Sequence, residues 1–174
     1  MFSDPTKNIG FLEVKDGMRV VDIGAGSGFY SIEVGKRVGS QGRVYAVDVQ
    51  RDLLDKLKTS AGLAGVHNIE VVWGNAEKIG GTKLREAIAD RVILSNTLFQ
   101  IEEKDRGNLA LELKRLMKPG AKLLVIDWTA GSPLSPKTLV PKLVAEGIFT
   151  KVGLTLENSF DAGDHHYGLI FKRA

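Results

Sequence analysis

The sequence contains no cysteine, and its 174 residues include only three histidines, His67, His165 and His166. Without cysteine the chain has no disulfide, no thiolate metal ligand and no cysteine nucleophile. Three histidines, two of them adjacent, leave little from which to build a histidine metal site. We therefore expect no bound metal.

The chain also lacks long apolar runs. Its first ten residues, MFSDPTKNIG, contain polar residues and a proline where a secretory signal has an apolar stretch. Hydrophobic residues make up 43% of the chain and charged residues 26%, which is typical of a soluble globular protein. We expect an untargeted, cytoplasmic protein without a membrane span.

Basic residues form no cluster, although the formal net charge is +3 and the pI is about 9.1. Lysines and arginines alternate with acids in stretches such as RDLLDKLK, which is typical of the exposed face of a helix. A nucleic-acid surface would gather basic residues on one face or groove. The charge pattern therefore does not favour a nucleic-acid substrate, and the sequence leaves the oligomeric state open.

Short apolar runs alternate with longer amphipathic segments along most of the chain. The runs predict strands buried on both faces, and the segments have the spacing of helices with one apolar face. The predicted strands are Arg19 to Ile23, Val44 to Val47, Ile69 to Trp73, Arg91 to Leu94 and Lys122 to Ile126. The predicted helices are Tyr30 to Val38, a stretch around Leu53 to Ala61, a short piece near Leu84 to Ile88, and a stretch around Leu109 to Met117. This order predicts an α/β sandwich in which a mostly parallel sheet has helices on both faces.

The last third of the chain departs from this alternation. Residues 132–149, SPLSPKTLVPKLVAEGIF, predict a loop followed by a helix. The stretches FTKVGLTLENSF and HHYGLIFKRA predict two strands, which the turn residues DAGD join. Strands with so short a connection pair antiparallel, so we expect an antiparallel hairpin at the C-terminal end of the sheet.

The stretch VVDIGAGSGFYS, residues 20–31, passes from an apolar strand through three alternating glycines into a helix. The glycines leave backbone N–H groups open at a helix N-terminus, where negative or polar ligand groups bind. Asp48 ends the next strand, from which its carboxylate can accept hydrogen bonds from both hydroxyls of a ribose. Together they predict a nucleoside ligand. A nicotinamide dinucleotide would use the same acid, but its fingerprint requires glycine at the sixth position, which is Phe29 here.

The glycine spacing after Asp22, in VVDIGAGSG, resembles motif I of the class I S-adenosylmethionine-dependent methyltransferases. Four more stretches are similar to motifs of that family: VYAVDV, VVWGNAEKI, DRVILSNTLFQI and RLMKPGAKLLVIDW. The likeness extends from about Val14 to the C-terminus, and it is closest in character to the small-molecule methyltransferases of ubiquinone and menaquinone biosynthesis. It implies a Rossmann-like sandwich with a seven-stranded sheet and one antiparallel strand.

The resemblance also implies S-adenosylmethionine as cofactor and S-adenosylhomocysteine as product. Asp48 would then bind the ribose, while Asn75 and Ala76 would lie beside the adenine. Asp22 would orient the glycine turn or meet the ammonium group through water, and Tyr30 would lie near the sulfonium. The residues implied to bind the cofactor are Asp22, Gly24, Ala25, Gly26, Gly28, Tyr30, Asp48, Val49, Asn75, Ala76, Ser95 and Asn96.

We interpret residues 1–174 as a single methyltransferase domain. Residues 1–17 would form an N-terminal flap or helix, residues 18–128 the cofactor-binding core, and residues 129–174 the C-terminal helix and hairpin.

The implied reaction is in-line transfer of a methyl group to a small-molecule acceptor, mainly through proximity, which requires no covalent catalyst. A base can still help where the acceptor is a phenol, a hydroxyl or an acid. Candidates on the acceptor side are Asp127 and Trp128 after the fifth strand, and His165 and His166 at the start of the last strand. RNA or protein acceptors stay open. So do two other functions, a nicotinamide-dependent oxidoreductase and a cofactor-binding partner subunit that does not catalyse.

Overall fold

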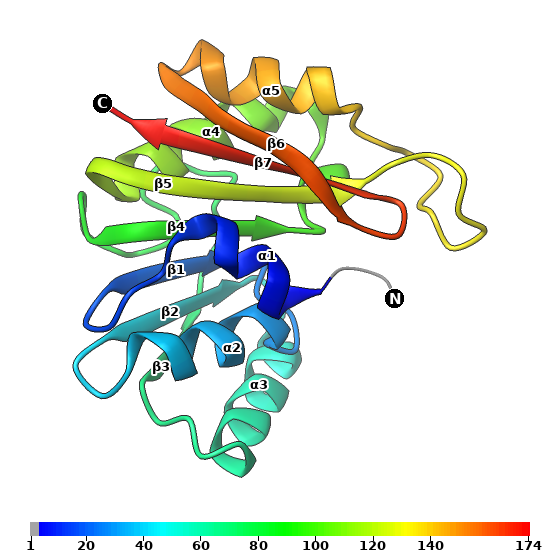
Figure 1. Cartoon of the computed structure of the whole chain (residues 1–174). Helices are drawn as coiled ribbons and strands as arrows, with labels where there is room; N and C mark the ends of the chain where they lie inside the picture. The colour runs from blue at the N-terminus through cyan, green and yellow to red at the C-terminus, as the bar shows by residue number, and fades with distance from the viewer. Residues whose placement is uncertain (1–3) are drawn as a thin grey trace.

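The computed structural model describes residues 4–174, in which one seven-stranded sheet has the order β3-β2-β1-β4-β5-β7-β6 (Figure 1). The strands from β3 to β5 pair in parallel, whereas β7 runs antiparallel to both β5 and β6. The bounds are β1 (Arg19–Ile23), β2 (Arg43–Asp48), β3 (Ile69–Trp73), β4 (Ala89–Ser95), β5 (Met117–Trp128), β6 (Leu154–Gly163) and β7 (His166–Arg173). The predicted mostly parallel sheet with a C-terminal antiparallel hairpin is confirmed.

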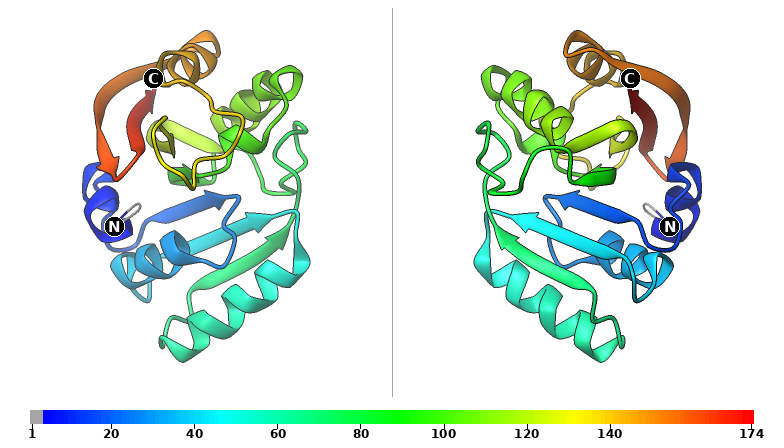
Figure 2. Two further views of the ribbon diagram at one scale, coloured as in Figure 1. Left: turned by 90° about the vertical axis from the view of Figure 1, so that its right-hand side faces the viewer. Right: turned by 90° about the vertical axis from the view of Figure 1, so that its left-hand side faces the viewer.

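Helices cover both faces of this sheet, as predicted (Figure 2). One face packs against α1 (Pro5–Leu12), α2 (Phe29–Val38) and α3 (Arg51–Leu63). The other packs against α4 (Glu103–Leu116) and α5 (Lys142–Lys151). Because both faces are covered, neighbouring strand residues such as Val20 and Val21 are both fully buried, on opposite sides. This is why the strands have continuous apolar sequences.

The short helix predicted near Leu84 to Ile88 is wrong. The segment is a loop that crosses from β3 to β4, and Lys83 and Ala87 have φ angles of 61° and 49°. Its backbone is held by α4, because the Arg115 guanidinium donates to the Leu84 carbonyl at 2.9 Å and the Ala87 N–H donates to the Arg115 carbonyl at 2.9 Å. Bonds to a neighbouring element replace the bonds of a local helix.

Two strand starts differ most from the prediction. β5 begins at Met117 rather than Lys122, because Met117 already pairs with Ala89 of β4, and an irregularity that contains Pro119 and Gly120 separates this pair from Lys122 and Arg91. The first hairpin strand begins at Leu154 rather than Phe149, because α5 continues to Lys151.

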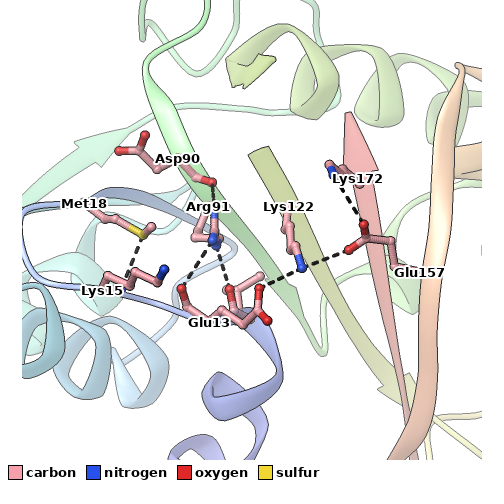
Figure 3. Close-up of polar contacts among 9 residues, drawn as sticks. Glu13, Lys15, Met18, Asp90, Arg91, Lys122, Glu157 and Lys172 are labelled. Carbon is pink, nitrogen blue, oxygen red and sulfur yellow. Dashed lines mark hydrogen bonds and ion pairs between the residues drawn. The ribbon is translucent and has the colours of Figure 1, made fainter. Parts of the chain in front are cut away.

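Helix α1 is held firmly against the sheet. Arg91 of β4 is 9% exposed, and its guanidinium donates to the Leu12 carbonyl at 2.6 Å and the Glu13 carbonyl at 3.3 Å, at the C-terminal end of the helix. Figure 3 shows Lys122 bridging the carboxylates of Glu13 and Glu157, at 2.8 and 2.9 Å. The two bonds from Arg91 satisfy backbone carbonyls that the helix end leaves open, whereas Lys122 binds side-chain carboxylates.

The middle of α1 is fixed by a buried amide. The Asn8 side chain is fully buried, and its Nδ2 donates to the Tyr30 hydroxyl at 3.0 Å and to the Ala162 carbonyl at 2.9 Å. Helix α1 is thus a packed part of the sandwich. The first three residues of the predicted N-terminal flap lie outside the described residues, so closure of this segment over a ligand stays a prediction.

We expect Arg91→Met to loosen α1 without unfolding the sheet, because two helix-end carbonyls lose a charged donor. The substitution should lower the free energy of unfolding by about 1–3 kcal/mol. Trypsin cleavage after Lys7 should become faster than in the wild type. Arg19→Met, at an exposed position on β1, is the matched control. Equal cleavage rates at Lys7 in Arg91→Met and wild type would show that the cap does not hold the helix.

Candidate active site

The glycine turn after β1 lies between the C-terminal ends of β2 and β4. The N–H groups of Gly24 and Ala25 both donate to the Val47 carbonyl, at 2.9 and 3.1 Å. Gly24 has a φ of 66°, and a Cβ built on it would lie 2.2 Å from the Thr97 Oγ1. Only glycine fits this backbone and this spacing. The strand ends are close together because no side chain separates them.

Gly26 has the opposite surroundings. Its φ is 55°, and a Cβ built on it would have no heavy atom within 4 Å. Its α-carbon therefore borders open space at the N-terminus of α2, where a ligand can approach the bare backbone.

Asp48, the last residue of β2, joins this turn to its own strand. Its Oδ2 accepts the Gly26 N–H at 2.9 Å, and its Oδ1 accepts the Gln50 N–H at 2.9 Å. The residue is 7% exposed. Each carboxylate oxygen keeps a further lone pair, so Asp48 can still accept bonds from a ligand.

Asp22 is a second buried acid beside the turn. Its Oδ2 accepts a hydrogen bond from the Ser31 hydroxyl at 2.6 Å. Burial raises the pKa of Asp22 from 3.8 to about 7, and the negative charge of Asp48 adds to this effect, whereas the bond from Ser31 opposes it. Two acids in a buried site favour a cationic ligand.

These residues line one pocket of about 700 Å³ at the C-terminal edge of the sheet. Every residue implied to bind the cofactor lines it except Gly28, whose α-carbon instead faces Leu57 of α3. The pocket thus brings together Asp22, Gly24, Ala25, Gly26, Tyr30, Asp48, Val49, Asn75, Ala76, Ser95 and Asn96. The geometry supports their prediction as a binding site, and direct contact with a ligand stays a prediction.

The sequence analysis missed other lining residues. Thr97 and Ile101 flank the short 3-10 turn Leu98–Gln100 after β4; the motif-like stretch DRVILSNTLFQI contains both, but neither was named as a binding residue. Pro5 enters from the start of α1, far away along the chain. The Ser-Asn-Thr run directly after a buried strand was the available signal for Thr97, since open α/β sheets bind ligands at such strand ends.

Asn96 differs from the other lining residues. It has a φ of 51°, its N–H donates to the Ile126 carbonyl at 2.9 Å, and its buried Oδ1 has no partner among the described residues. A buried acceptor without a donor is costly unless a ligand supplies one. Its place in the pocket wall makes Asn96 a candidate ligand contact.

The structure places the acceptor-side candidates on opposite faces of the sheet. Asp127 is fully buried and accepts the N–H groups of Phe99 at 2.9 Å and Trp128 at 2.8 Å. Burial raises its pKa to about 6, although these bonds oppose the shift. Because successive strand residues point to opposite faces, Asp127 lies against the core and lines neither pocket described here. It holds the turn after β4.

Trp128 and His166 are paired across β5 and β7, and their rings lie 4.2 Å apart between centroids. The Nδ1 of His166 lies 2.7 Å from the Asp164 carbonyl, which can only accept, so Nδ1 carries the proton. Its buried Nε2 has no partner among the described residues. His165 lies in the turn, with a φ of 58°. Both histidines line a second hollow of about 460 Å³.

A family model for the methyltransferase domain matches residues 14–150. The chain belongs to the methyltransferase domain family. It is 33% identical over 133 residues to the ubiquinone/menaquinone biosynthesis C-methyltransferase UbiE of Bordetella avium (strain 197N), covering 74% of this chain and 48% of that protein. The protein of the same name from Haemophilus ducreyi is 30% identical over 159 residues, covering 88% of this chain and 57% of that relative.

The solved structure of a SAM-dependent methyltransferase from Aquifex aeolicus has the same fold, with a TM-score of 0.87 and 27% identity over 99% of this chain and 91% of that chain. The domain is therefore a class I S-adenosylmethionine-dependent methyltransferase. It spans about half the length of the curated relatives it matches. The comparisons give no support to a nicotinamide-dependent oxidoreductase. Among residues 4–174, no helix has the length and apolar character needed to cross a membrane.

The pocket residues of this methyltransferase fit the cofactor. The bare α-carbon of Gly26 leaves room beside the backbone, and the Asn96 Oδ1 offers an acceptor without a donor. Asp22 and Asp48 provide negative charge near one another, which suits a ligand that carries a sulfonium and an ammonium group.

We expect Asp22→Asn to stabilise the ligand-free protein at neutral and alkaline pH. The unfolded carboxyl loses its proton near its ordinary pKa of 3.8, whereas the folded one holds it until about 7, so stability falls as pH rises between these values. Asparagine does not titrate and can still accept the bond from Ser31. The gain in melting temperature should be small near pH 4, should grow up to about pH 7 and should then stay constant.

Thermal unfolding at several pH values tests this, with Asp55→Asn on the exposed surface of α3 as control. A gain that does not change with pH would contradict a buried carboxyl at Asp22.

Proposed function

We propose that this domain methylates a small-molecule acceptor, with the cofactor in the main pocket and the acceptor beside Trp128. The observation that carries the proposal is the joining of the glycine turn, Asp48 and Asn75 in one pocket of about 700 Å³. The ubiquinone/menaquinone names of the relatives support a small-molecule acceptor. The matches cover only 48% and 57% of those proteins, so their substrate does not transfer to this chain directly.

One group of pocket residues binds the adenine end of the cofactor, and another group binds its methionine end. Asp48 lies between them and accepts the ribose hydroxyls with the lone pairs that its backbone bonds leave free. Val49, Asn75 and Ala76 hold the adenine. The methionine end takes the turn from Gly24 to Gly26, together with Asp22, Tyr30, Ser95 and Asn96.

The cofactor, when bound, supplies a methyl group on a positively charged sulfur. The protein contributes alignment and the exclusion of water, which together can account for about 7–11 kcal/mol of a reaction barrier. Tyr30 is held at its hydroxyl by Asn8, so its ring forms a fixed wall of the pocket.

His166 is the best candidate base on the acceptor side. The bond from its Nδ1 to the Asp164 carbonyl fixes the tautomer, and this leaves Nε2 as a proton acceptor. Thr129 and Lys142 line the same hollow and add polar groups that can bind an oxygen-bearing acceptor. Asp127 is withdrawn as a catalytic candidate, because its carboxylate holds backbone N–H groups on the other face of the sheet.

Macromolecular acceptors and a non-catalytic role are weaker alternatives. An RNA acceptor would be favoured by a basic surface, and no basic cluster is visible in the sequence. A partner subunit that only binds the cofactor would have no use for a hydrogen-bonded histidine in a second hollow. Location in the cytoplasm remains an expectation from composition.

Calorimetry with S-adenosylhomocysteine should show one binding site, and Asp48→Ala should weaken the affinity about tenfold to a hundredfold, because charged hydrogen bonds to the ribose are lost. Glu70→Ala removes an exposed acid from the neighbouring strand and should leave the affinity unchanged. If Asp48→Ala binds as tightly as the wild type, Asp48 does not hold the ribose.

Transfer of a radioactive methyl group from S-adenosylmethionine to a fractionated cell extract should label the small-molecule fraction. With the labelled acceptor, His166→Asn should reduce turnover about a hundredfold or more, since asparagine keeps a donor to the Asp164 carbonyl but lacks the basic nitrogen. Binding of S-adenosylhomocysteine should stay unchanged, and His67→Asn, at an exposed position after α3, is the matched control.

Label found only in RNA or protein would contradict the small-molecule acceptor. Full turnover in His166→Asn, with an unchanged pH profile, would remove His166 from the reaction.

A further inference from the structure

The loop from Gly74 to Thr82, after β3, forms the adenine end of the main pocket and closes tightly on itself. The Asn75 N–H donates to the Gly81 carbonyl at 2.9 Å, and the Gly81 N–H donates to the Lys78 carbonyl at 2.8 Å. A Cβ built on Gly81 would lie 2.1 Å from the Asn75 carbonyl oxygen. The two limbs of the loop are therefore in direct backbone contact.

Helix α4 holds the returning limb of this loop through a buried acid. The Glu112 side chain has no exposed surface, and its carboxylate accepts the Gly80 N–H at 2.7 Å and the Thr82 hydroxyl at 2.5 Å. Arg115 donates to the same carboxylate at 2.7 and 2.8 Å. Burial alone would raise the pKa of Glu112, but these bonds outweigh it and lower the pKa to about 2. The loop is thus anchored by a charged group at neutral pH.

The side-chain amide of Asn75 has a fixed orientation in this loop. Its Oδ1 accepts the Glu77 N–H at 2.8 Å, and an N–H donor can be accepted only by the oxygen. The Asn75 carbonyl also accepts the Lys78 N–H, at 3.4 Å. Among the described residues, none accepts a bond from the Asn75 Nδ2. The pocket wall therefore presents an amide donor, beside an oxygen that keeps one lone pair.

We propose that Asn75 lets the pocket accept the purine base with either an amino or an oxo group at position 6. This inference rests on the proposed place of the adenine. A 6-amino group donates hydrogen bonds and can use the free lone pair of Oδ1, whereas a 6-oxo group accepts and can use Nδ2. The oxo form also carries a proton on N1, which either Oδ1 or a carboxylate can accept, but a carboxylate has no donor for the 6-oxo group itself and therefore favours the amino form.

The test compares S-adenosylhomocysteine with its deaminated form, S-inosylhomocysteine, by calorimetry. The wild type should bind the two with dissociation constants within about tenfold of each other. Asn75→Asp keeps the shape and the bond from Glu77, and it should weaken S-inosylhomocysteine about tenfold or more relative to S-adenosylhomocysteine. Asn108→Asp makes the same change at an exposed position on α4 and should keep the wild-type ratio.

Glu112→Gln tests the effect of the loop's position on binding without changing the Asn75 amide. It should weaken both ligands by a similar factor, because the loop shifts while the Asn75 amide is unchanged. Rejection of S-inosylhomocysteine by more than about tenfold in the wild type would overturn the inference, and so would an unchanged ratio in Asn75→Asp. If S-adenosylhomocysteine itself does not bind the wild type, the proposed function fails instead.

Discussion

The hydrogen bond from the Gly26 N–H to the Asp48 carboxylate is the contact on which the site depends. It joins the turn after β1 to the end of β2, at 2.9 Å, and so places a bare stretch of backbone beside a buried acid. The contact requires that β1, β2 and β4 end close together, which Gly24 permits by leaving Thr97 room. A single feature of the sequence, glycine without a side chain, therefore produces both the close strand ends and the open wall of the pocket.

The rest of the molecule holds this arrangement from two sides. Arg91 and Asn8 fix α1, which brings Pro5 to the pocket, while Glu112 and Arg115 of α4 fix the loop that carries Asn75. The supporting groups are buried and charged or hydrogen-bonded. The site itself lowers the stability of the ligand-free protein, since Asp22 keeps a carboxyl in a position where burial raises its pKa to about 7. Such a cost to stability is expected where a protein binds a cation.

Most of the fold could be predicted from the periodicity of apolar residues, and most of the pocket from the residues that follow the strand ends. Parallel strands bring their C-terminal ends to one edge, so residues after β1, β2, β3 and β4 could be grouped before their contacts were known. The sequence could not separate Asp127 from Trp128 as candidates, because adjacent strand residues face opposite sides and only the pairing of β5 with β7 shows that Trp128 shares a face with His166. The segment near Leu84 was predicted as a helix because local spacing cannot show that its backbone is held by Arg115, which lies far away along the chain. Glu112 had a visible signal, since it lies on the apolar face of α4 with Leu109 and Leu116.

The comparisons establish the methyltransferase family, and the geometry supports a particular place for each part of the cofactor. The most direct test is a crystal structure of the protein with S-adenosylhomocysteine. It should show both ribose hydroxyls on the Asp48 carboxylate, the base beside Asn75 and the homocysteine end along the turn from Gly24 to Gly26. A ligand bound instead in the hollow beside His166, with the main pocket unchanged, would contradict the account.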